Sequence, residues 1–411
     1  MLRRRFLLGT LGSTILLPVG RSATAAMTGE APSRRSPRLV VVFLRGAIDG
    51  LSVVVPYGDP DYYRARTSIA IPPPGQDGGG LDLDGYFALH PALAPLWPCW
   101  QAGQLAFVHA AGSPDPTRSH FDAQDYMESG TPGRKSTADG WLNRLLSILP
   151  GGGNALNVGA VMPRALAGPQ PVAVLASGPS ATRPSPLDRP QVASAFDELY
   201  AGNGKMDQAY RESRHSRQDM LAALSGDNLE IEMQRASNGA APASVFAEDA
   251  GRLARLMRSD PRVRLAFLGV GGWDTHANQG AGRGQLANHL QPLASGLATL
   301  AQGLGPTLDD TVVVVMSEFG RTVRENGNGG TDHGHGNVMW LLGGSVVGGK
   351  VHGRWPGLGA GALHEGRDLP VTTDFRDVLA TLAERHLRLK NGDMATLFPG
   401  FGPNRLPLIR T

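Results

Sequence analysis

The chain has 411 residues, of which 41% are hydrophobic and 18% are charged, a composition typical of a globular protein rather than a disordered one. Its 55 glycines and 31 prolines argue against a helical bundle, because they indicate many tight turns and long ordered loops. The formal charge is only +3, and the single cysteine, Cys99, excludes an intramolecular disulfide.

The first 26 residues, "MLRRRFLLGTLGSTILLPVGRSATAA", have a basic start, a moderately apolar stretch and small residues at the end. This pattern is typical of a secretory signal, and it is too short and too broken by glycine for a spanning helix. The Arg3-Arg4 pair resembles the twin-arginine signal, which exports folded proteins across the bacterial inner membrane. We therefore expect a periplasmic or secreted protein that engages the twin-arginine translocation machinery. An ordinary signal and an uncleaved anchor are the alternatives.

Removal of this leader changes the charge balance. Four of the 39 basic residues lie in the leader, so 35 remain against 36 acidic residues and the formal charge becomes −1. A protein without a basic surface is a poor partner for nucleic acid. No segment after the leader is long and apolar enough to span a membrane.

Residues 27–37 form a polar, proline-bearing linker, and we expect one α/β domain over residues 38–405. Buried strands are predicted by short apolar runs rich in β-branched residues. These runs are "RLVVVFL", "QLAFVHA", "PVAVLAS", "VRLAFLGV", "TVVVVMS" and "NVMWLLGG". Helical patterns such as "FDAQDYMES" and "FRDVLATLAERHL" lie between them. This alternation predicts a doubly wound, mostly parallel sheet with helices on both faces.

The middle of the chain, residues 151–259, mixes segments rich in proline and glycine with polar helical stretches. We interpret it as a partly helical insertion in the sheet domain or a cap on it. A small separate helical domain is the alternative.

Polar residues follow several of the predicted strands. In an open α/β sheet, ligands bind beyond the carboxyl ends of the strands, so these side chains are expected at one edge. They are Asp49, Asp274, His276, Glu318, His333 and His335. Carboxylates and imidazoles are ligands that divalent metals take, and the combination predicts a metal site. Taken singly, each residue is also consistent with a helix cap, a turn or a surface position.

Four segments resemble the metal-binding framework of the alkaline phosphatase superfamily, which includes sulfatases and cofactor-independent phosphoglycerate mutases. They are "RGAIDGLSVVVPYGDPDYY", "RSHFDAQDYMESGTPG", "GGWDTHANQ" and "SEFGRT…DHGHGN". More narrowly, the chain resembles an exported bacterial family known as domain of unknown function 1501. The resemblance implies an alkaline-phosphatase-like fold and one or two divalent metal ions, which could be zinc, manganese, magnesium or calcium.

The resemblance implies a role for each strand-end residue. Asp274, His276 and His335 correspond to ligands of a first metal, with His333 and its neighbour Asp332 able to bind or orient it.

Asp49 and Glu318 correspond to ligands of a second metal. Phe319 stands where the superfamily has a histidine ligand, and phenylalanine cannot bind a metal. Either His333 fills that position, or the second site is weak, missing or suited to a harder ion such as calcium.

Ser119 opens a helical pattern and has Asp122 three residues later, as in a capping box. The resemblance implies that Ser119 is the nucleophile, whereas the pattern alone is equally consistent with a simple N-cap. Ser113 and Thr117 are rival hydroxyls. Two arginines, Arg118 and Arg321, are candidates to hold the outer oxygens of an anionic substrate.

The sequence thus favours hydrolysis or transfer at a phosphate or sulfate ester of a small molecule or polysaccharide, through a serine nucleophile and bound metal. A non-catalytic, metal-stabilised binding protein on the same scaffold is the alternative. Isomerisation of a sugar phosphate is a third possibility. All three predict that the candidate residues lie together at one site.

Overall fold

The computed structural model describes residues 36–135, 137–178 and 228–410. The predicted leader, residues 1–26, and residues 27–35 of the predicted linker lie outside the described residues. No helix within the described ranges is long and apolar enough to cross a membrane.

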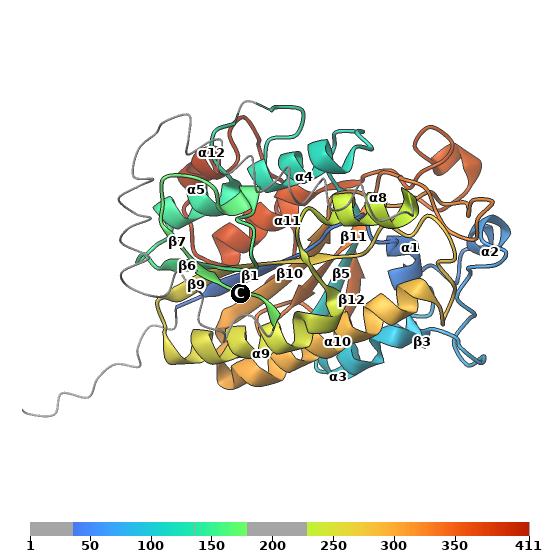
Figure 1. The fold of residues 1–411 in the computed structure, drawn as a ribbon, viewed down its shortest axis with the longest axis horizontal. Coiled ribbons are helices and arrows are strands. Elements are labelled where there is room, and N and C mark those ends of the chain that lie inside the picture. The colour runs from blue at the N-terminus through green and yellow to red at the C-terminus, as the bar shows by residue number, and fades with distance from the viewer. Residues whose placement is uncertain (1–35, 136, 179–227, 411) are drawn as a thin grey trace, which may run out of the picture. The chain divides into compact units, whose positions relative to one another are not determined.

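A ten-stranded sheet forms the centre of the domain (Figure 1). Its strands run in the order β12-β5-β11-β10-β1-β9-β6-β7, with β13 beside β5 and β8 beside β9. The strands are β1 (Arg38–Leu44), β5 (Leu105–Gly112), β6 (Asn154–Val158), β7 (Val172–Leu175), β8 (Ala241–Pro242), β9 (Val263–Gly271), β10 (Thr311–Ser317), β11 (Asn337–Leu342), β12 (Lys350–His352) and β13 (Thr373–Asp374). Neighbouring strands pair in parallel, except that β11 is antiparallel to both β10 and β5.

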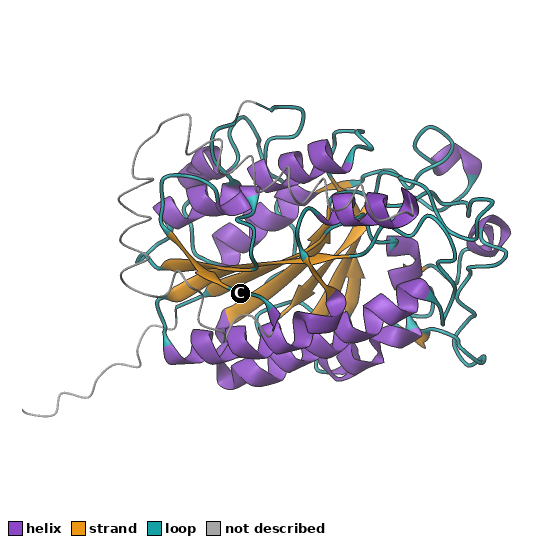
Figure 2. Cartoon of the chain, viewed as in Figure 1, coloured by secondary structure: helices purple, strands orange, loops and turns teal. Residues whose placement is uncertain are grey.

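Helices cover both faces of this sheet (Figure 2). The longest helices in the described ranges are α9 (Ala243–Ser259) and α10 (Gln285–Leu304), which lie side by side on one face together with α3 (Trp97–Gln101). The opposite face carries α4 (His120–Ser129), α5 (Trp141–Ile148), α11 (Phe375–Thr381) and α12 (Met394–Leu397). The remaining α-helices of the described residues are α1 (Gly50–Val53), α2 (Pro60–Ala65) and α8 (Asn228–Ser237), and a small second sheet joins β2 (Val54–Val55), β4 (Ala88–Leu89) and β3 (Leu81–Asp82).

Strand β1 shows why the sequence folds into three layers. Its side chains alternate between the faces of the sheet, so Val40 and Val42 pack with α9 and α10, whereas Val41 and Phe43 pack with α5 and α11. Every residue of β1 is buried, which is why the run is continuously apolar rather than alternating. The predicted doubly wound, mostly parallel α/β fold is confirmed.

The segment interpreted as an insertion or cap, residues 151–259, falls partly within the described residues. Its described part contributes β6 and β7 to the main sheet, and β6 pairs in parallel with β9. It also contributes α9, whose apolar side chains belong to the core. Residues 179–227 of this segment lie outside the described residues.

The register of the central strands brings three loops to one edge. Leu44, the last residue of β1, is opposite Ser317 at the end of β10 and opposite Val270 near the end of β9. Because all three strands are parallel, the loops that follow them start side by side. These loops carry Asp49, Asp274 and Glu318.

Candidate metal centre

Asp274, on the loop after β9, lies among three imidazole rings. Its Oδ1 atom is 3.1 Å from Nε2 of His276 and 3.3 Å from Nε2 of His333. Its Oδ2 atom is 3.5 Å from Nε2 of His120, which lies in the first turn of α4. The side chain of Asp274 is only 3% exposed. Residues from three distant parts of the chain therefore converge on one buried carboxylate.

Each imidazole is oriented by a partner at its other nitrogen. Nδ1 of His120 is 2.8 Å from Oε1 of Glu318, and Nδ1 of His276 is 3.3 Å from Oδ1 of Asp332. Nδ1 of His333 is 2.9 Å from the carbonyl oxygen of Arg118. Carbonyl and carboxylate oxygens accept hydrogen bonds, so we assign the ring proton to Nδ1 in each case. In a neutral ring the lone pair of the Nε2 atom is then directed towards Asp274, whereas a second proton on the ring makes Nε2 a donor to that carboxylate.

The convergence of these lone pairs is the feature that points to a metal. Nε2 of His333 is 3.0 Å from Nε2 of His120 and 3.0 Å from Nε2 of His276. Two nitrogen lone pairs this close repel each other unless a proton or a cation lies between them. Ligand atoms of His120, Asp274 and His333 all lie within 4.8 Å of one another. With His276 beside them, three nitrogens and one oxygen form a donor set suited to zinc or a similar divalent ion.

The charges of the cluster fit the same interpretation. Burial alone would raise the pKa of Asp274, but hydrogen bonds from His120, His276 and His333 together with Arg321 hold it well below its ordinary value. Burial also opposes the ionisation of Glu318, yet the contacts with His120 and Gln124 lower its pKa to about 2. Burial would lower the pKa of His120, but hydrogen bonds with Asp274 and Glu318 outweigh burial and raise it to about 9. A proton on His120 therefore competes with a metal ion at neutral pH.

Glu318, predicted as a metal ligand, supports the cluster through His120. It follows β10, its side chain is fully buried, and its Oε1 atom also accepts from the backbone N–H of Gly46 at 2.8 Å and from Gln124 at 3.0 Å. Phe319 lies against the ring of His120 at 4.9 Å and that of His333 at 5.1 Å, measured between ring centroids. Glu318 and Phe319 therefore both contact imidazole rings of the cluster.

Asp49, also predicted as a metal ligand, has a protein cation as its partner. Its two carboxylate oxygens accept from Arg66, at 2.5 Å and 2.9 Å, and both side chains are fully buried. Oδ2 also accepts from Ser52 and from Gln279, each at 2.7 Å. Burial opposes ionisation of Asp49, but Arg66 outweighs it and lowers the pKa. The structure therefore places Asp49 in a separate buried ion pair.

His335 lies in a different neighbourhood from His333, although only one residue separates them. Its ring packs against that of His364, with the centroids 4.5 Å apart and the ring planes tilted by 31°. Burial, followed by the neighbouring His364, lowers the pKa of His335 to about 4. Of the predicted ligands, Asp274, His276 and His333 contact one another and Glu318 is linked to them through His120, whereas Asp49 and His335 have partners of their own.

Ser119 is the exposed N-cap residue of α4 and directly precedes His120. Its hydroxyl oxygen accepts weakly from the backbone N–H of Asp122, at 3.5 Å. The hydroxyl therefore lies next to the cluster in sequence and is accessible to solvent.

The two arginines differ in exposure. The guanidinium of Arg118 is partly exposed and donates to Glu365 at 2.6 Å and to Asp368 at 2.7 Å. The side chain of Arg321 is fully buried and donates to Asp274 and to the carbonyl oxygens of Ala47 and Thr331. Arg321 therefore ties together the loops that carry the cluster.

His120 is the residue of the centre that our sequence analysis did not identify. It lies within "RSHFD", a segment already singled out for Ser119, and the available signal was an imidazole at the first helical position. Sequence alone gave no reason to prefer it to other histidines, because no strand precedes it directly.

A family model described as "Protein of unknown function (DUF1501)" matches residues 91–397, more than half of the chain, so the protein belongs to that family. No curated protein matches the sequence.

Among solved structures, the chain is similar to the C-terminal periplasmic domain of EcEptC from Escherichia coli, with 10% identity, a TM-score of 0.40 and coverage of 91% of this chain and 90% of that one. It is also similar to Ps i-CgsB in complex with a neocarrahexaose, with 12% identity, a TM-score of 0.38 and coverage of 90% and 75%. PsFucS1 sulfatase from Pseudoalteromonas sp. has 12% identity, a TM-score of 0.37 and coverage of 90% and 74%.

Proposed function

We propose that this protein is an exported, metal-dependent enzyme that hydrolyses or transfers phosphate or sulfate esters. The observation that carries the proposal is the convergence of three imidazole Nε2 atoms on Asp274, with each ring oriented by a partner at Nδ1. Metal-binding histidines commonly have such second partners, which fix the tautomer and the direction of the lone pair. An arrangement that served only to fill the core would not need lone pairs facing one another.

The residues that would hold the ion are His120, His276, His333 and Asp274. Three nitrogens and one carboxylate favour zinc or manganese over magnesium or calcium, which prefer oxygen ligands. A divalent ion held there supplies Lewis-acid chemistry: it lowers the pKa of a nearby hydroxyl and offsets charge on the transferred group.

Ser119 is the proposed nucleophile. In the proposed reaction the Ser119 hydroxyl gives up its proton as its Oγ forms a bond to the phosphorus or sulfur atom, the bond to the ester's alcohol oxygen breaks, and the leaving oxygen takes up a proton. Water then cleaves the serine ester and releases the inorganic anion. The free N–H groups in the first turn of α4, a helix of ten residues, favour negative charge beside Ser119. The partly exposed Arg118 orients the His333 ring through its carbonyl oxygen, and its guanidinium would hold an anionic group by exchanging a contact with Glu365 or Asp368 for the substrate.

A non-catalytic, metal-stabilised binding protein is the second candidate. It is favoured by the ion pair of Asp49 with Arg66 and by Phe319, which together occupy positions where the resemblance implied a second metal. A site with a single ion lacks the second cation that would stabilise a leaving oxygen. Both candidate functions require a bound metal ion, but only the enzyme turns over an ester.

The location is part of the proposal. The leader over residues 1–26, with its Arg3-Arg4 pair, supports export by the twin-arginine translocation machinery to the periplasm or beyond. Exchange of both arginines for lysine should retain the protein in the cytoplasm, which fractionation of cells would measure.

Elemental analysis of purified protein, followed by assays with an aryl phosphate and an aryl sulfate, tests the function. We expect about one divalent ion per chain and turnover of one of the two esters, both lost in His120→Ala. His352→Ala is the matched control, because His352 lies on β12 and bonds to Val347 at 2.9 Å rather than to the cluster. If the metal-loaded protein turns over neither ester, the result would support the non-catalytic binding function. A protein that takes up no metal would refute both candidates.

A further inference from the structure

A tight turn beside the metal cluster carries both acidic and basic side chains. The backbone N–H of Asp368 donates to the carbonyl oxygen of His364 at 3.0 Å, and that of His364 donates to Asp368 at 2.8 Å, so the chain reverses between them. Nη2 of Arg367, within the turn, donates to the carbonyl oxygen of His333 at 2.8 Å. Arg118 contacts the turn through Asp368, and its own carbonyl oxygen is the partner of the His333 ring. Two arginines of this region are therefore tied to a proposed metal ligand.

Arg118 has two carboxylate partners that differ in burial. Its Nη2 atom is 2.7 Å from Oδ2 of Asp368, whose side chain is fully buried, and 2.6 Å from Oε2 of Glu365, whose side chain is 58% exposed. Oδ1 of Asp368 is also 3.0 Å from Nε of Arg367, so Asp368 anchors both guanidinium groups. Breaking a buried ion pair is costly, whereas an exposed pair contributes little. The contact with Glu365 is therefore the one that a ligand can exchange.

The backbone of Glu365 has a conformation that is costly for a residue with a side chain. Its φ angle is 53°, and that of the next residue, Gly366, is 66°. Turns with positive φ at both central residues prefer asparagine, aspartate or glycine at the first of them. Glycine would adopt this conformation without strain, so a contact of the glutamate side chain is expected to offset the cost. The hydrogen bond that this side chain makes is the one to Arg118.

Two nitrogen atoms of the residues that flank the Glu365 carboxylate lack a partner. Nε of Arg118 and Nε2 of His364 are buried and have no hydrogen-bond partner among the described residues. Nε2 of His364 is 4.0 Å from Oε1 of Glu365, which is too far for a hydrogen bond. A carboxylate has two oxygens in one plane, whereas a phosphate or sulfate ester has three outer oxygens in a tetrahedral arrangement. A tetrahedral anion would thus have oxygens for nitrogens that the carboxylate leaves without a partner.

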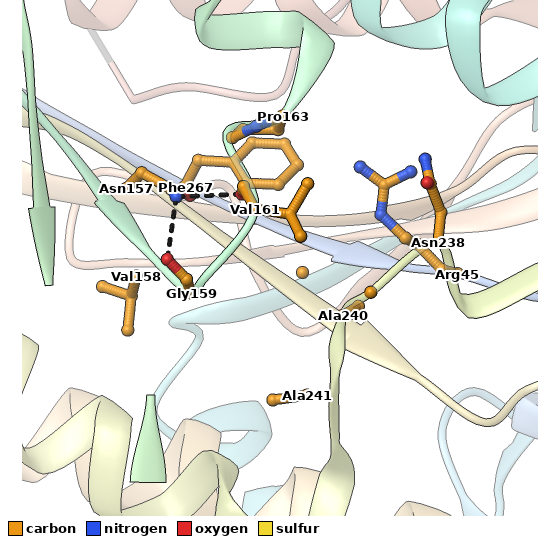
Figure 3. Close-up of a pocket in the computed structure, with 12 residues that line it drawn as sticks. Arg45, Asn157, Val158, Gly159, Val161, Pro163, Asn238, Ala240, Ala241 and Phe267 are labelled. Carbon is orange, nitrogen blue, oxygen red and sulfur yellow. Dashed lines mark hydrogen bonds between the residues drawn. The ribbon is translucent and has the colours of Figure 1, made fainter. Parts of the chain in front are cut away.

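Arg45 shows the opposite arrangement, in a hollow at the carboxyl ends of β1, β6 and β9 (Figure 3). Its Nη2 atom is 2.6 Å from Oε1 of Glu128, and the two side chains are only 5% and 2% exposed. Asn157, also in the hollow, donates to the carbonyl oxygens of Gly159 at 3.2 Å and Val161 at 3.1 Å. Both polar side chains are therefore bonded within the protein, and an anion finds no exposed carboxylate to replace there.

We propose that the exposed carboxylate of Glu365 occupies an anion subsite at Arg118, and that the anionic group of a phosphate or sulfate ester displaces it. Arg367 and His364 complete the subsite. The inference rests on the proposed function, which assigns an anionic group to Arg118. With Glu365 in place, two guanidinium groups face two carboxylates, whereas its departure leaves one net positive charge beside Asp368. Because a carboxylate ligand gains little over Glu365 itself, the exchange favours a tetrahedral anion.

Isothermal titration calorimetry of the purified protein with sodium sulfate and with sodium phosphate, at constant ionic strength, tests the exchange. Glu365→Gln should bind at least one of these anions about twofold to fivefold more tightly than the parent, the effect of removing one competing exposed ion pair. Glu365→Gly should do the same, and it suits the positive φ angle. Arg118→Met should weaken binding by about tenfold or more, because it removes charge-assisted hydrogen bonds. Parent-like binding in Arg118→Met would overturn the location.

Glu248→Gln is the matched control. Glu248 is 48% exposed and is paired with Arg252 on α9, outside the turn. The variant makes the same change in net charge as Glu365→Gln and should bind both anions like the parent. Equal gains in the two variants would overturn the proposal, since net charge would account for both. Unchanged affinity in Glu365→Gln and Glu365→Gly would also overturn it, as would the absence of anion binding in every variant.

The titration also distinguishes this inference from the proposed function. If the Glu365 variants gain affinity and neither aryl ester is turned over, the enzyme proposal fails while the anion subsite stands. If an ester is turned over and the affinity of both Glu365 variants is unchanged, the subsite fails and the function stands.

Discussion

The negative charges of Asp49 and Asp274 are compensated by different kinds of neighbour. Each is a buried carboxylate on a loop that follows one of two neighbouring parallel strands, β1 and β9. Asp49 has a protein cation, Arg66, bound to both of its oxygens. Asp274 receives one contact from Arg321, and its remaining neighbours are three imidazoles.

This difference indicates which of the two strand ends is suited to binding a metal ion. The contacts of Asp49 with Arg66, Ser52 and Gln279 give its oxygens hydrogen-bond donors and a full compensating charge. The imidazoles around Asp274 are themselves electron-pair donors, so they add ligands rather than positive charge when they are neutral. A strand-end aspartate is therefore a metal candidate only when its partners are donors of lone pairs.

Arg66→Met should have the largest effect and should act on stability alone. Removing one partner of a buried ion pair leaves an uncompensated charge, which costs about 3–5 kcal/mol. Chemical denaturation would measure the loss, and elemental analysis should find the metal content of the folded fraction unchanged. The double variant Asp49→Asn/Arg66→Met should recover part of the stability. Loss of metal in Arg66→Met would indicate that the Asp49–Arg66 pair and the cluster around Asp274 form one site.

Part of the pH dependence of stability should come from the same pair. The folded-state pKa of Asp49 is lowered, so its contribution to stability is present above the ordinary pKa of an aspartate, about 4, and is lost as the pH falls through the folded value. Denaturation midpoints measured at decreasing pH should fall more steeply for the parent than for Asp49→Asn. Parallel curves would mean that the ion pair does not distinguish the folded from the unfolded state.

His120→Ala should remove metal binding with a smaller direct effect on the metal-free fold. Loss of one of four ligands is expected to weaken the affinity by roughly 100-fold or more, because outer partners alone contribute tenfold to 100-fold. Isothermal titration with zinc would measure it. A chelator should lower the melting temperature of the parent and leave that of the variant unchanged, since a bound ion stabilises the native state. Equal responses of parent and variant would contradict the assignment.

Asp332→Asn should weaken metal binding by about tenfold, because it changes the partner at Nδ1 of His276 without removing a ligand. Asp332 is half-exposed, so the fold should tolerate the change. The same titration would measure the affinity. An effect as large as that of His120→Ala would indicate that Asp332 itself binds the ion.

Ser119→Ala should have the smallest effect on stability, at most about 1 kcal/mol, the usual value for an N-cap. Its cap hydrogen bond is long, at 3.5 Å, which argues for the lower part of that range. Ester turnover should be lost while metal affinity is retained. Ser113→Ala tests the rival hydroxyl. If turnover survives in Ser119→Ala but is lost in Ser113→Ala, the nucleophile is Ser113 rather than Ser119.

Much of the fold was predictable from the sequence because buried strands have a local signature. The runs "RLVVVFL" and "TVVVVMS" are long, apolar and β-branched, and they form β1 and β10 side by side. The sheet edge that carries the candidate metal ligands followed from the same reasoning, since Asp274, Glu318 and His276 come after strands whose ends share an edge.

The identity of each residue's partner was not predictable in this way. Asp49 and Asp274 follow strands of the same kind, yet only the tertiary structure places Arg66 beside one and His120 beside the other. His333 and His335 are close in sequence, but one contacts Asp274 and the other packs against His364.

The sequence by itself determined the sheet, its helical layers and the edge at which the candidate residues gather, because burial and strand periodicity are properties of short segments. Only the tertiary structure decided which carboxylate is neutralised by arginine, which is surrounded by imidazoles and which helix supplies His120. The physical reason is that a metal centre depends on the directions of lone pairs in three dimensions. Those directions are set by contacts between residues as far apart in the chain as His120 and His333.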